Sequence, residues 1–196
     1  MVWLSPIKKR SRHPEIYLGP SFSWCSLLGR VEWPPIEHEV PRITILDIYC
    51  KLKGLDPTGE VQSCAIKVRG RLATAHLVHK GDGTGSDSTQ SFGLERADGT
   101  RVDCSIDAQE DYPRSRFYDP DSGMDARSEE HSLVYCLVVL QDSRRDAGEC
   151  CALIAVPSAN ERSTFERIGI VYAAKQNFWD DSSSIVSQPG DKVLGA

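Results

Sequence analysis

The sequence has no long apolar run and no apolar N-terminal leader, and these absences exclude whole classes of protein. Its longest apolar stretch, residues 133–140, is far shorter than the run of about 18 that a membrane-spanning helix needs. Too few apolar residues precede the first charges to form a signal-peptide core. We therefore expect a cytoplasmic protein with no membrane partner.

Paired cysteines of the Cys-x-x-Cys type are also absent. The seven cysteines are an odd set, unlike the disulfide framework of a secreted domain or the ligand set of a zinc module. Asn160 and Asn177 lie in no glycosylation sequon, which agrees with a reducing compartment. We interpret each cysteine as a small buried apolar side chain. The seven are Cys25, Cys50, Cys64, Cys104, Cys136, Cys150 and Cys151.

An excess of basic charge is the third absence. Lys and Arg number 23 against 28 Asp and Glu, which gives a net charge of -5. Proteins that bind nucleic acid normally carry a clustered basic surface, so we predict no nucleic-acid partner. The basic run at residues 8–12 can be read as a nuclear-import or phosphate-binding patch, but a solvated linker is the simpler interpretation.

What the sequence does contain is alternation of apolar and polar residues, the pattern of a half-buried strand. It is clearest on either side of the turn-rich residues 54–59, which predicts a hairpin. We expect the eight apolar side chains of this hairpin to share the buried side of one sheet. They are Leu46, Ile48, Cys50 and Leu52 before the turn, and Cys64, Ile66, Val68 and Leu72 after it.

Further strands are expected along the rest of the chain. The nearly continuous apolar runs at 132–141 and 150–156 predict central strands buried on both faces. The Asp98-Gly99 dipeptide predicts a tight hairpin turn. A single helical turn is possible at 177–184. The other expected strands cover residues 75–79, 91–96, 101–106, 165–173 and 185–186.

These elements predict an all-β, mainly antiparallel fold with little helix: a β-sandwich or partly open barrel of about eight strands with a long polar insertion. The expected organisation has four parts. They are a basic N-terminal segment at 1–19, an aromatic linker at 20–40, a β domain at 41–188 with a polar loop at 109–131, and a loose C-terminal tail at 189–196.

Patterns that suggest chemistry are weak, and we predict no catalytic residue, metal or cofactor. His76 and His79 would point to opposite faces of a strand. The acidic residues between Asp119 and Glu130 fail the calcium-loop pattern because Met124 stands where glycine is required. The glycine-rich residues 81–85 lack the Lys-Ser/Thr of a phosphate-binding loop. A catalytic triad assembled only in the folded protein would escape this test.

Tryptophans are candidate partner anchors, because exposed aromatic residues are frequent binding hot spots. The neighbours of Trp24 alternate with it, which favours core packing. For Trp33 and Trp179 core packing and partner binding stay open.

Residues 17–31 read YLGPSFSWCSLLGRV. This segment resembles the Pro-Ser-Trp-Ser-Trp-Ala-Ser segment that follows the conserved domain of fungal heterokaryon-incompatibility (HET) proteins. Phe22 stands for the first usual Trp and Cys25 for the usual Ala, and both keep the alternation of apolar residues with serine. The matched motif is Pro20, Ser21, Phe22, Ser23 and Trp24.

The resemblance continues in residues 45–72, which look like the family's strand, Asp-Pro-x-Gly-Glu turn and second strand ending in Arg-Gly-Arg-Leu. It extends to residues 135–137 and to the Phe-Glu-Arg-Ile-Gly-Ile run at 165–170. The motif residues in these segments are Asp56, Pro57, Gly59, Glu60, Arg69, Gly70, Arg71, Phe165, Ile168 and Gly169.

In HET proteins the defining domain, related to the TIR fold, precedes the aromatic segment. This chain starts too late to contain it, and we expect either a truncated gene model or a naturally short relative. The resemblance therefore implies a non-catalytic accessory or regulatory β domain in fungal non-self recognition and programmed cell death. An upstream HET domain or another protein is the implied partner.

The alternative is a ligand-binding β-barrel or a small hydrolase with a cavity between its sheets. The interior of the β domain should distinguish the two. A polar cavity with converging His and Asp favours the alternative. A filled apolar core favours the accessory domain, and its expected members are Ile48, Ile66, Val68, Val138 and Ile154.

Overall fold

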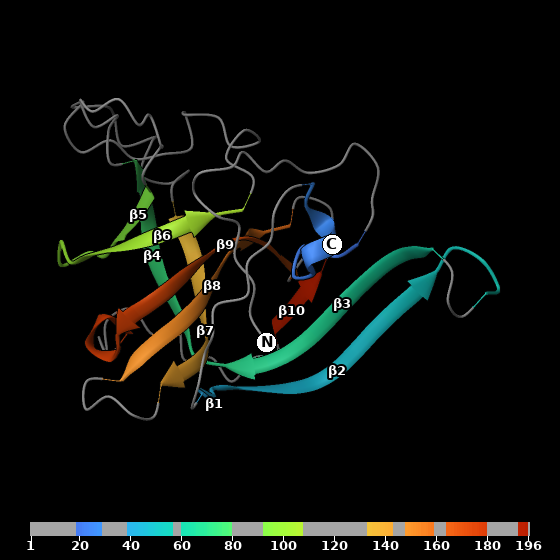
Figure 1. Cartoon of the computed structure of the whole chain (residues 1–196), viewed down its shortest axis with the longest axis horizontal. Helices are drawn as coiled ribbons and strands as arrows, with labels where there is room; N and C mark the ends of the chain where they lie inside the picture. Colours follow the sequence, from blue (N-terminus) through green and yellow to red (C-terminus); the bar gives the residue numbers. More distant parts are fainter. Residues whose placement is uncertain are drawn as a thin grey trace.

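The structure is a computed structural model, and it places most of the chain's strands in one antiparallel β architecture (Figure 1). Strands account for 72% of the described residues and helices for 6%, so the predicted all-β class is confirmed. No helix in this part of the chain is long and apolar enough to cross a membrane. The residues that the structure describes are 19–28, 39–56, 60–79, 92–107, 133–142, 148–158, 164–179 and 192–195.

Six strands form a closed barrel. Around the barrel, β4 pairs with β5, β5 with β6, β6 with β9, β9 with β8, β8 with β7, and β7 again with β4. All six pairings are antiparallel, and closure removes the exposed edges that an open sheet would present. The strands are β4 (Leu72–His79), β5 (Phe92–Glu95), β6 (Arg101–Ile106), β7 (Leu133–Asp142), β8 (Glu149–Pro157) and β9 (Thr164–Lys175).

The barrel interior is filled by apolar side chains from all six strands. Because successive side chains of a strand point to opposite faces, alternate residues of each strand enter the interior. Ile154 and Ala152 are completely buried there, and Val138 is 3% exposed. The interior set from the two longest apolar runs is Val134, Cys136, Val138, Cys150, Ala152 and Ile154.

A second apolar cluster covers the outer face of β7 and β8, and it explains why both strands read as continuous apolar runs. Leu137, Val139 and Cys151 point into this cluster, where they meet Phe165 and Val68. The prediction that 132–141 and 150–156 are central strands buried on both faces is therefore confirmed.

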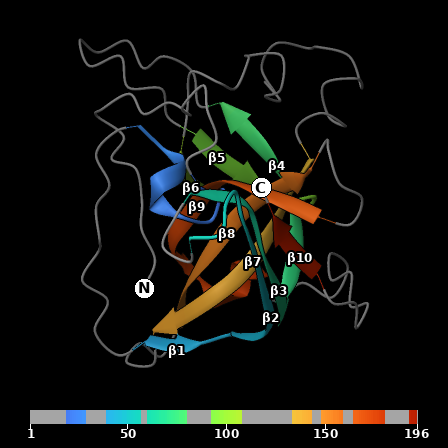
Figure 2. The ribbon, with the colours of Figure 1, turned by 90° about the vertical axis from the view of Figure 1, so that its right-hand side faces the viewer.

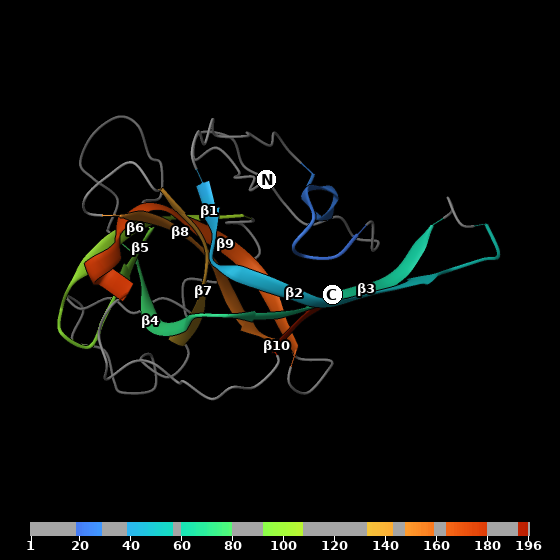
Figure 3. The same ribbon diagram turned by 90° about the horizontal axis from the view of Figure 1, so that it is seen from below.

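The predicted hairpin is confirmed as β2 (Ile43–Leu52) and β3 (Val61–Gly70), which pair antiparallel. It projects from the barrel as an arm, and its tip lies far from the other strands (Figures 1 and 3). The arm leaves the barrel beside β7, where β1 (Glu39–Pro41) pairs with the end of that strand (Figure 2). β10 (Lys192–Gly195) links β3 to the start of β9.

The predicted burial of the arm's apolar face is wrong for β2. Ile48 is 60% exposed, and Leu46 and Cys50 are also exposed. Of the second strand, Val68 is buried, whereas Cys64 and Ile66 are only partly so. The physical reason is that the arm extends past the barrel, so only its base, around Val68, packs against β7 and β9. Alternation predicts which face of a strand is apolar, but it does not predict whether another element packs against that face.

Four expectations about boundaries also change. Leu72 starts β4 rather than ending the second arm strand, because the ladder breaks at Arg71. The tail at 189–196 is not loose at Lys192–Gly195, which forms β10, and β1 begins inside the expected linker at 20–40. The expected helical turn is η4 (Gln176–Trp179), one residue earlier than predicted.

The tight turn between β5 and β6 is confirmed, since Gly99 has a φ of 80°, a backbone conformation that favours glycine. Several other expectations lie outside the described residues. They are the basic segment before residue 19, the glycine-rich residues 81–85, the polar loop 109–131, Trp33 and the strand at 185–186.

Candidate functional site

The aromatic motif segment folds back on itself in a short 3-10 helix, η1 (Trp24–Ser26). The Ser23 N–H donates to the Pro20 carbonyl at 2.8 Å, and the Ser26 N–H donates to the Ser23 carbonyl at 3.0 Å. The Ser26 hydroxyl donates to the same Ser23 carbonyl at 2.7 Å. The serines of the motif therefore build a local turn, a role for which serine is well suited because its hydroxyl bonds nearby backbone groups.

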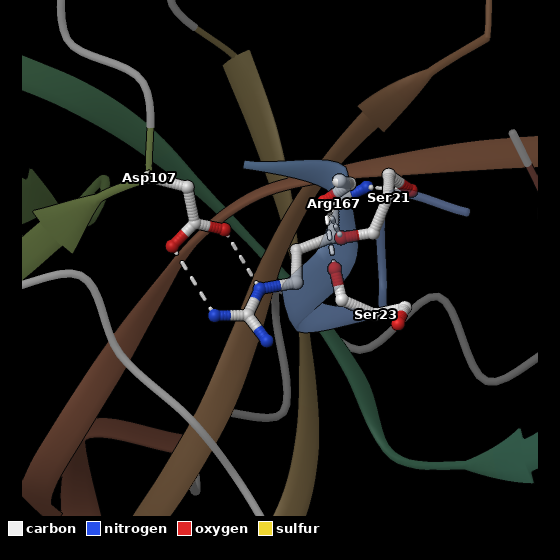
Figure 4. Close-up of polar contacts among 5 residues, drawn as sticks. Ser21, Ser23, Asp107 and Arg167 are labelled. Carbon is white, nitrogen blue, oxygen red and sulfur yellow. Dashed lines mark hydrogen bonds and ion pairs between the residues drawn. The ribbon is translucent and has the colours of Figure 1, made fainter. Parts of the chain in front are cut away.

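Ser21 fastens this segment to the barrel. The backbone N–H of Arg167 in β9 donates to the Ser21 hydroxyl oxygen at 3.0 Å (Figure 4). Phe22 packs against the outer cluster that also contains Phe165. Two segments of the motif set predicted from the sequence, far apart along the chain, thus meet at one place in the fold.

The Arg167 side chain is held by a buried ion pair. Its Nε lies 2.8 Å from Asp107 Oδ2 and its Nη2 lies 3.2 Å from Asp107 Oδ1, a two-point contact (Figure 4). Both side chains are 2% exposed. Burying two charges is costly unless they compensate one another, and the forked contact supplies that compensation. We call Ser21, Asp107 and Arg167 the junction.

Asp107 reaches the junction because it follows β6 directly. Its backbone N–H donates to the Ile168 carbonyl at 2.8 Å, which continues the β6–β9 ladder by one step. Sequence reasoning did not single out Asp107 or Arg167. An aspartate before a polar stretch and an arginine between strand residues carry no local signal of pairing, because the two are 60 residues apart.

The other late motif residues have packing roles. A Cβ atom on Gly169 would clash with the Ser105 carbonyl oxygen of the neighbouring strand, so only glycine allows this close approach of β6 and β9. Ile168 is 1% exposed inside the barrel. Phe165 packs edge-on against Tyr135, with ring centroids 5.0 Å apart.

In the Arg-Gly-Arg motif, Gly70 and Arg71 lie at the base of the arm. A Cβ atom on Gly70 would come within 2.7 Å of the Ile43 Cγ2 methyl group. Arg71 donates from Nη2 to the Trp179 carbonyl and thereby holds η4 against the barrel. Arg69 is exposed on the arm.

η4 closes one end of the barrel with aromatic side chains. Trp179 is 2% exposed and packs edge-on against Phe178, with ring centroids 4.7 Å apart. Arg96 donates to the Phe178 carbonyl at 2.8 Å and stacks its guanidinium over the Phe178 ring. Of the two roles left open for Trp179, the structure supports core packing.

The remaining motif residues lie near the tip of the arm or outside the residues that the structure describes. Glu60 pairs with Lys53 across the hairpin, Nζ to Oε2 at 3.0 Å, and Asp56 is exposed. Pro57 and Gly59 lie outside the described residues, as does the side chain of Trp24. His76 is half-buried on β4, whereas the side chain of His79 and the acidic stretch from Asp119 to Glu130 are not described.

The hollows found on the described part of the molecule lie at the barrel wall. One of about 300 Å³ is lined by Arg42, Arg71, Gln141 and Gln176, where the arm leaves the barrel. Another of about 460 Å³ lies between β6 and β9, beyond their last paired residues, and is lined in part by Arg101 and Tyr172. Of the core expected from the sequence, Val138 and Ile154 fill the interior and Val68 the outer cluster, while Ile48 faces solvent.

Comparisons with protein-family models, with curated proteins and with solved structures found no match for this chain. The geometry therefore carries the functional argument. At the junction, the Arg167 guanidinium holds the Asp107 carboxylate and the Ser21 oxygen accepts a backbone N–H. These contacts hold a segment in place.

Proposed function

We propose that this chain is a non-catalytic accessory domain of a fungal HET-type protein, acting in non-self recognition and programmed cell death. The barrel fixes the position of the aromatic segment, and the segment in turn positions a HET domain placed before it. The single observation that carries the proposal is the bond from the Arg167 N–H to Ser21, backed by the buried pair with Asp107.

The rigidity of the anchor supports this role. Arg167 pairs with Ala155 in the β8–β9 ladder, and Asp107 continues the ladder from β6. The segment is therefore bonded to a strand that is itself paired on both sides, rather than to a loop. Sites built on strands hold their partners in more precise geometry than sites built on loops.

A fusion experiment in a filamentous-fungal host tests the proposal. A HET domain alone and the same domain joined before this chain are expressed at equal levels, and the fraction of dead cells is scored. We expect the two proteins to differ in killing, and we expect this chain alone to be inert. Equal killing by the HET domain with and without this chain would contradict the proposal.

Variants connect that outcome to the junction. Ser21→Ala removes the acceptor of the Arg167 N–H and should return killing toward the level of the HET domain alone. Leu55→Ala is the matched control, because Leu55 is fully exposed at the tip of the arm. Unchanged killing in the Ser21 variant, or an equal effect of the Leu55 variant, would show that the junction has no part in the coupling.

The second hypothesis, a ligand-binding barrel, is favoured by one observation. The hollow of about 460 Å³ between β6 and β9 falls within the size range of small-molecule sites, and it offers Arg101 and Lys175 beside Tyr172. A thermal-shift screen of small anionic compounds tests it. A stabilising compound whose effect is lost in Val102→Trp, which narrows the hollow, would support ligand binding.

A further inference from the structure

The arm carries two cysteines that face each other across the hairpin. Cys50 of β2 lies directly opposite Cys64 of β3. Both are free thiols, with Cys50 exposed and Cys64 partly buried. Their side chains lie on the apolar face that also carries Ile48 and Ile66, which are the next pair on that face.

The hydrogen-bond pattern defines which kind of pair this is. The Ile48 N–H is bonded to its own neighbour, Asp47 Oδ1, at 2.8 Å, so it points away from β3. The Lys53 N–H donates to the Glu60 carbonyl at 2.8 Å and points into the hairpin. The backbone N–H groups of a strand alternate in direction. The Cys50 N–H, like the Ile48 N–H, therefore points away from β3.

Cys50 and Cys64 therefore form a non-hydrogen-bonded pair, in which opposite Cα atoms lie about 4.5 Å apart. That separation falls within the range of roughly 4.4 to 6.8 Å spanned by disulfides. A bond between the sulfur atoms therefore needs no rearrangement of the arm's backbone.

The two thiols differ in reactivity. Burial, and then the hydrogen bond with Cys50, raise the pKa of Cys64 to about 11, so at neutral pH this thiol is protonated. Cys50 is open to solvent and is the sulfur that an oxidant reaches first. This asymmetry is the arrangement of an attacking and a resolving cysteine.

We propose that Cys50 and Cys64 are a redox-active pair that a hydroperoxide closes into a disulfide. The Cys50 thiolate attacks the terminal peroxide oxygen and the O–O bond breaks, which gives a sulfenic acid. The leaving alkoxide, or hydroxide when the oxidant is hydrogen peroxide, takes up the proton that the thiol had released. Cys64 then attacks the Cys50 sulfur, the S–S bond forms, and the hydroxyl leaves as water with the Cys64 proton. Two equivalents of a small thiol such as glutathione reverse the reaction and become its disulfide.

The bond would secure the exposed strand of the arm. β2 is the outer strand of the sheet and pairs only with β3 among the described strands. A covalent link at Cys50–Cys64 would hold the distal half of β2 on β3 even when the backbone hydrogen bonds between the two strands break. Oxidation would thus convert a hairpin that can open into one that cannot.

Cys25 is the competing thiol. It belongs to the motif segment, half-buried, and its charge contributes to the raised pKa of Cys64, so it lies within electrostatic reach. It is not the register partner of Cys64, and its sulfur lies 3.0 Å from the Ser23 hydroxyl. The pairing of Cys64 with Cys50 rather than with Cys25 is the specific claim to test.

Peptide mapping of the full chain tests the pair. The reduced, desalted protein is treated with an equimolar amount of hydrogen peroxide, alkylated and digested without reductant. We expect a linked Cys50–Cys64 peptide that lacks two hydrogens and disappears on treatment with glutathione. The buried Cys104 and Cys136 should remain alkylatable only after unfolding.

Two variants keep the test decisive. Cys25→Ser should form the same link to at least the same extent. Cys64→Ser should leave Cys50 as a sulfenic acid, which dimedone traps. A dominant Cys25–Cys64 link, a Cys50 link between two molecules, or no link at all would overturn the proposal.

Discussion

Arg167 brings a positive charge into a site where only 3% of the residue meets water. Its guanidinium is compensated by Asp107, and its N–H fixes Ser21. A buried pair of this kind contributes little net stability relative to apolar residues, but removing one partner leaves the other charge buried and uncompensated. The junction is therefore more sensitive to single than to paired replacement.

The first prediction follows from that asymmetry. Asp107→Ala should lower the free energy of unfolding by about 3 to 5 kcal/mol, because it leaves the Arg167 charge unpaired. The double variant Asp107→Leu with Arg167→Met should cost clearly less than the single change. Urea denaturation at neutral pH measures both. A double variant that loses as much as the sum of the two single variants would mean that the residues are not coupled.

Cys136 gives a prediction about pH. Complete burial in the barrel raises the pKa of this thiol from its ordinary value of 9.0 to about 12. The unfolded chain loses its proton near pH 9 while the folded chain keeps it, so rising pH favours unfolding between these values. The stabilising effect is complete below about pH 9 and is lost as pH approaches 12.

Comparison with Cys136→Ala isolates this contribution from the lysines and tyrosines that titrate in the same range. The wild-type protein should lose stability more steeply than the variant from about pH 9 to about pH 11, between the pKa of the unfolded thiol and that of the folded one. Chemical denaturation at each pH measures the free energy of unfolding of both proteins. If the two free energies fall in parallel as pH rises, Cys136 is not buried as a thiol.

At the scale of elements, the barrel and the arm are both built from strands rich in apolar residues, but their surroundings differ. Alternation in β2 and β3 resembles the alternation of a half-buried sheet, yet Ile48 is 60% exposed while Ile154 of β8 is completely buried. The difference lies in neighbours: β8 has β7 and β9 on either side and an apolar cluster on each face.

This contrast yields a matched pair of substitutions. Ile154→Ala should lower the free energy of unfolding by about 2 to 5 kcal/mol, because it leaves a cavity in the barrel interior. Ile48→Ala, the same chemical change, should stay within about 0.5 kcal/mol of the wild type, as expected for a surface position. Thermal or urea unfolding checks both. Equal losses would mean that the apolar face of the arm is covered.

Local signals in the sequence were sufficient to predict most strands and turns. The apolar runs of β7 and β8, the hairpin of the arm and the turn at Gly99 all depend on neighbours within a few residues. Barrel closure depends on pairings between distant strands, and the exposure of β2 depends on where the arm points. No local pattern carries that information.

The candidate site was likewise predictable only in part from local sequence. Ser21 and the 165–170 run were singled out from the sequence as parts of an expected family motif, and the structure brings them together. Asp107 was missed because its role comes only from the return of β9 alongside β6. The family assignment itself stays a prediction.

At the scale of the whole molecule, two apolar clusters share the wall formed by β7 and β8. The inner cluster fills the barrel, and the outer one is covered by the base of the arm, Phe22 of the motif segment and Phe165. Loosening the motif segment should therefore disturb the outer cluster and leave the inner one intact. The distal arm, which touches neither cluster, should not respond.

Hydrogen exchange measured by mass spectrometry tests the central claim, that the motif segment is fastened to the barrel through the junction. In the wild-type protein, residues 19–28 should exchange more slowly than an unfolded chain, and β7 to β9 should be slowest of all. Ser21→Ala should raise exchange in residues 19–28 and at the start of β9 while leaving the distal arm unchanged. Exchange of residues 19–28 at the unfolded rate in the wild type would contradict the account.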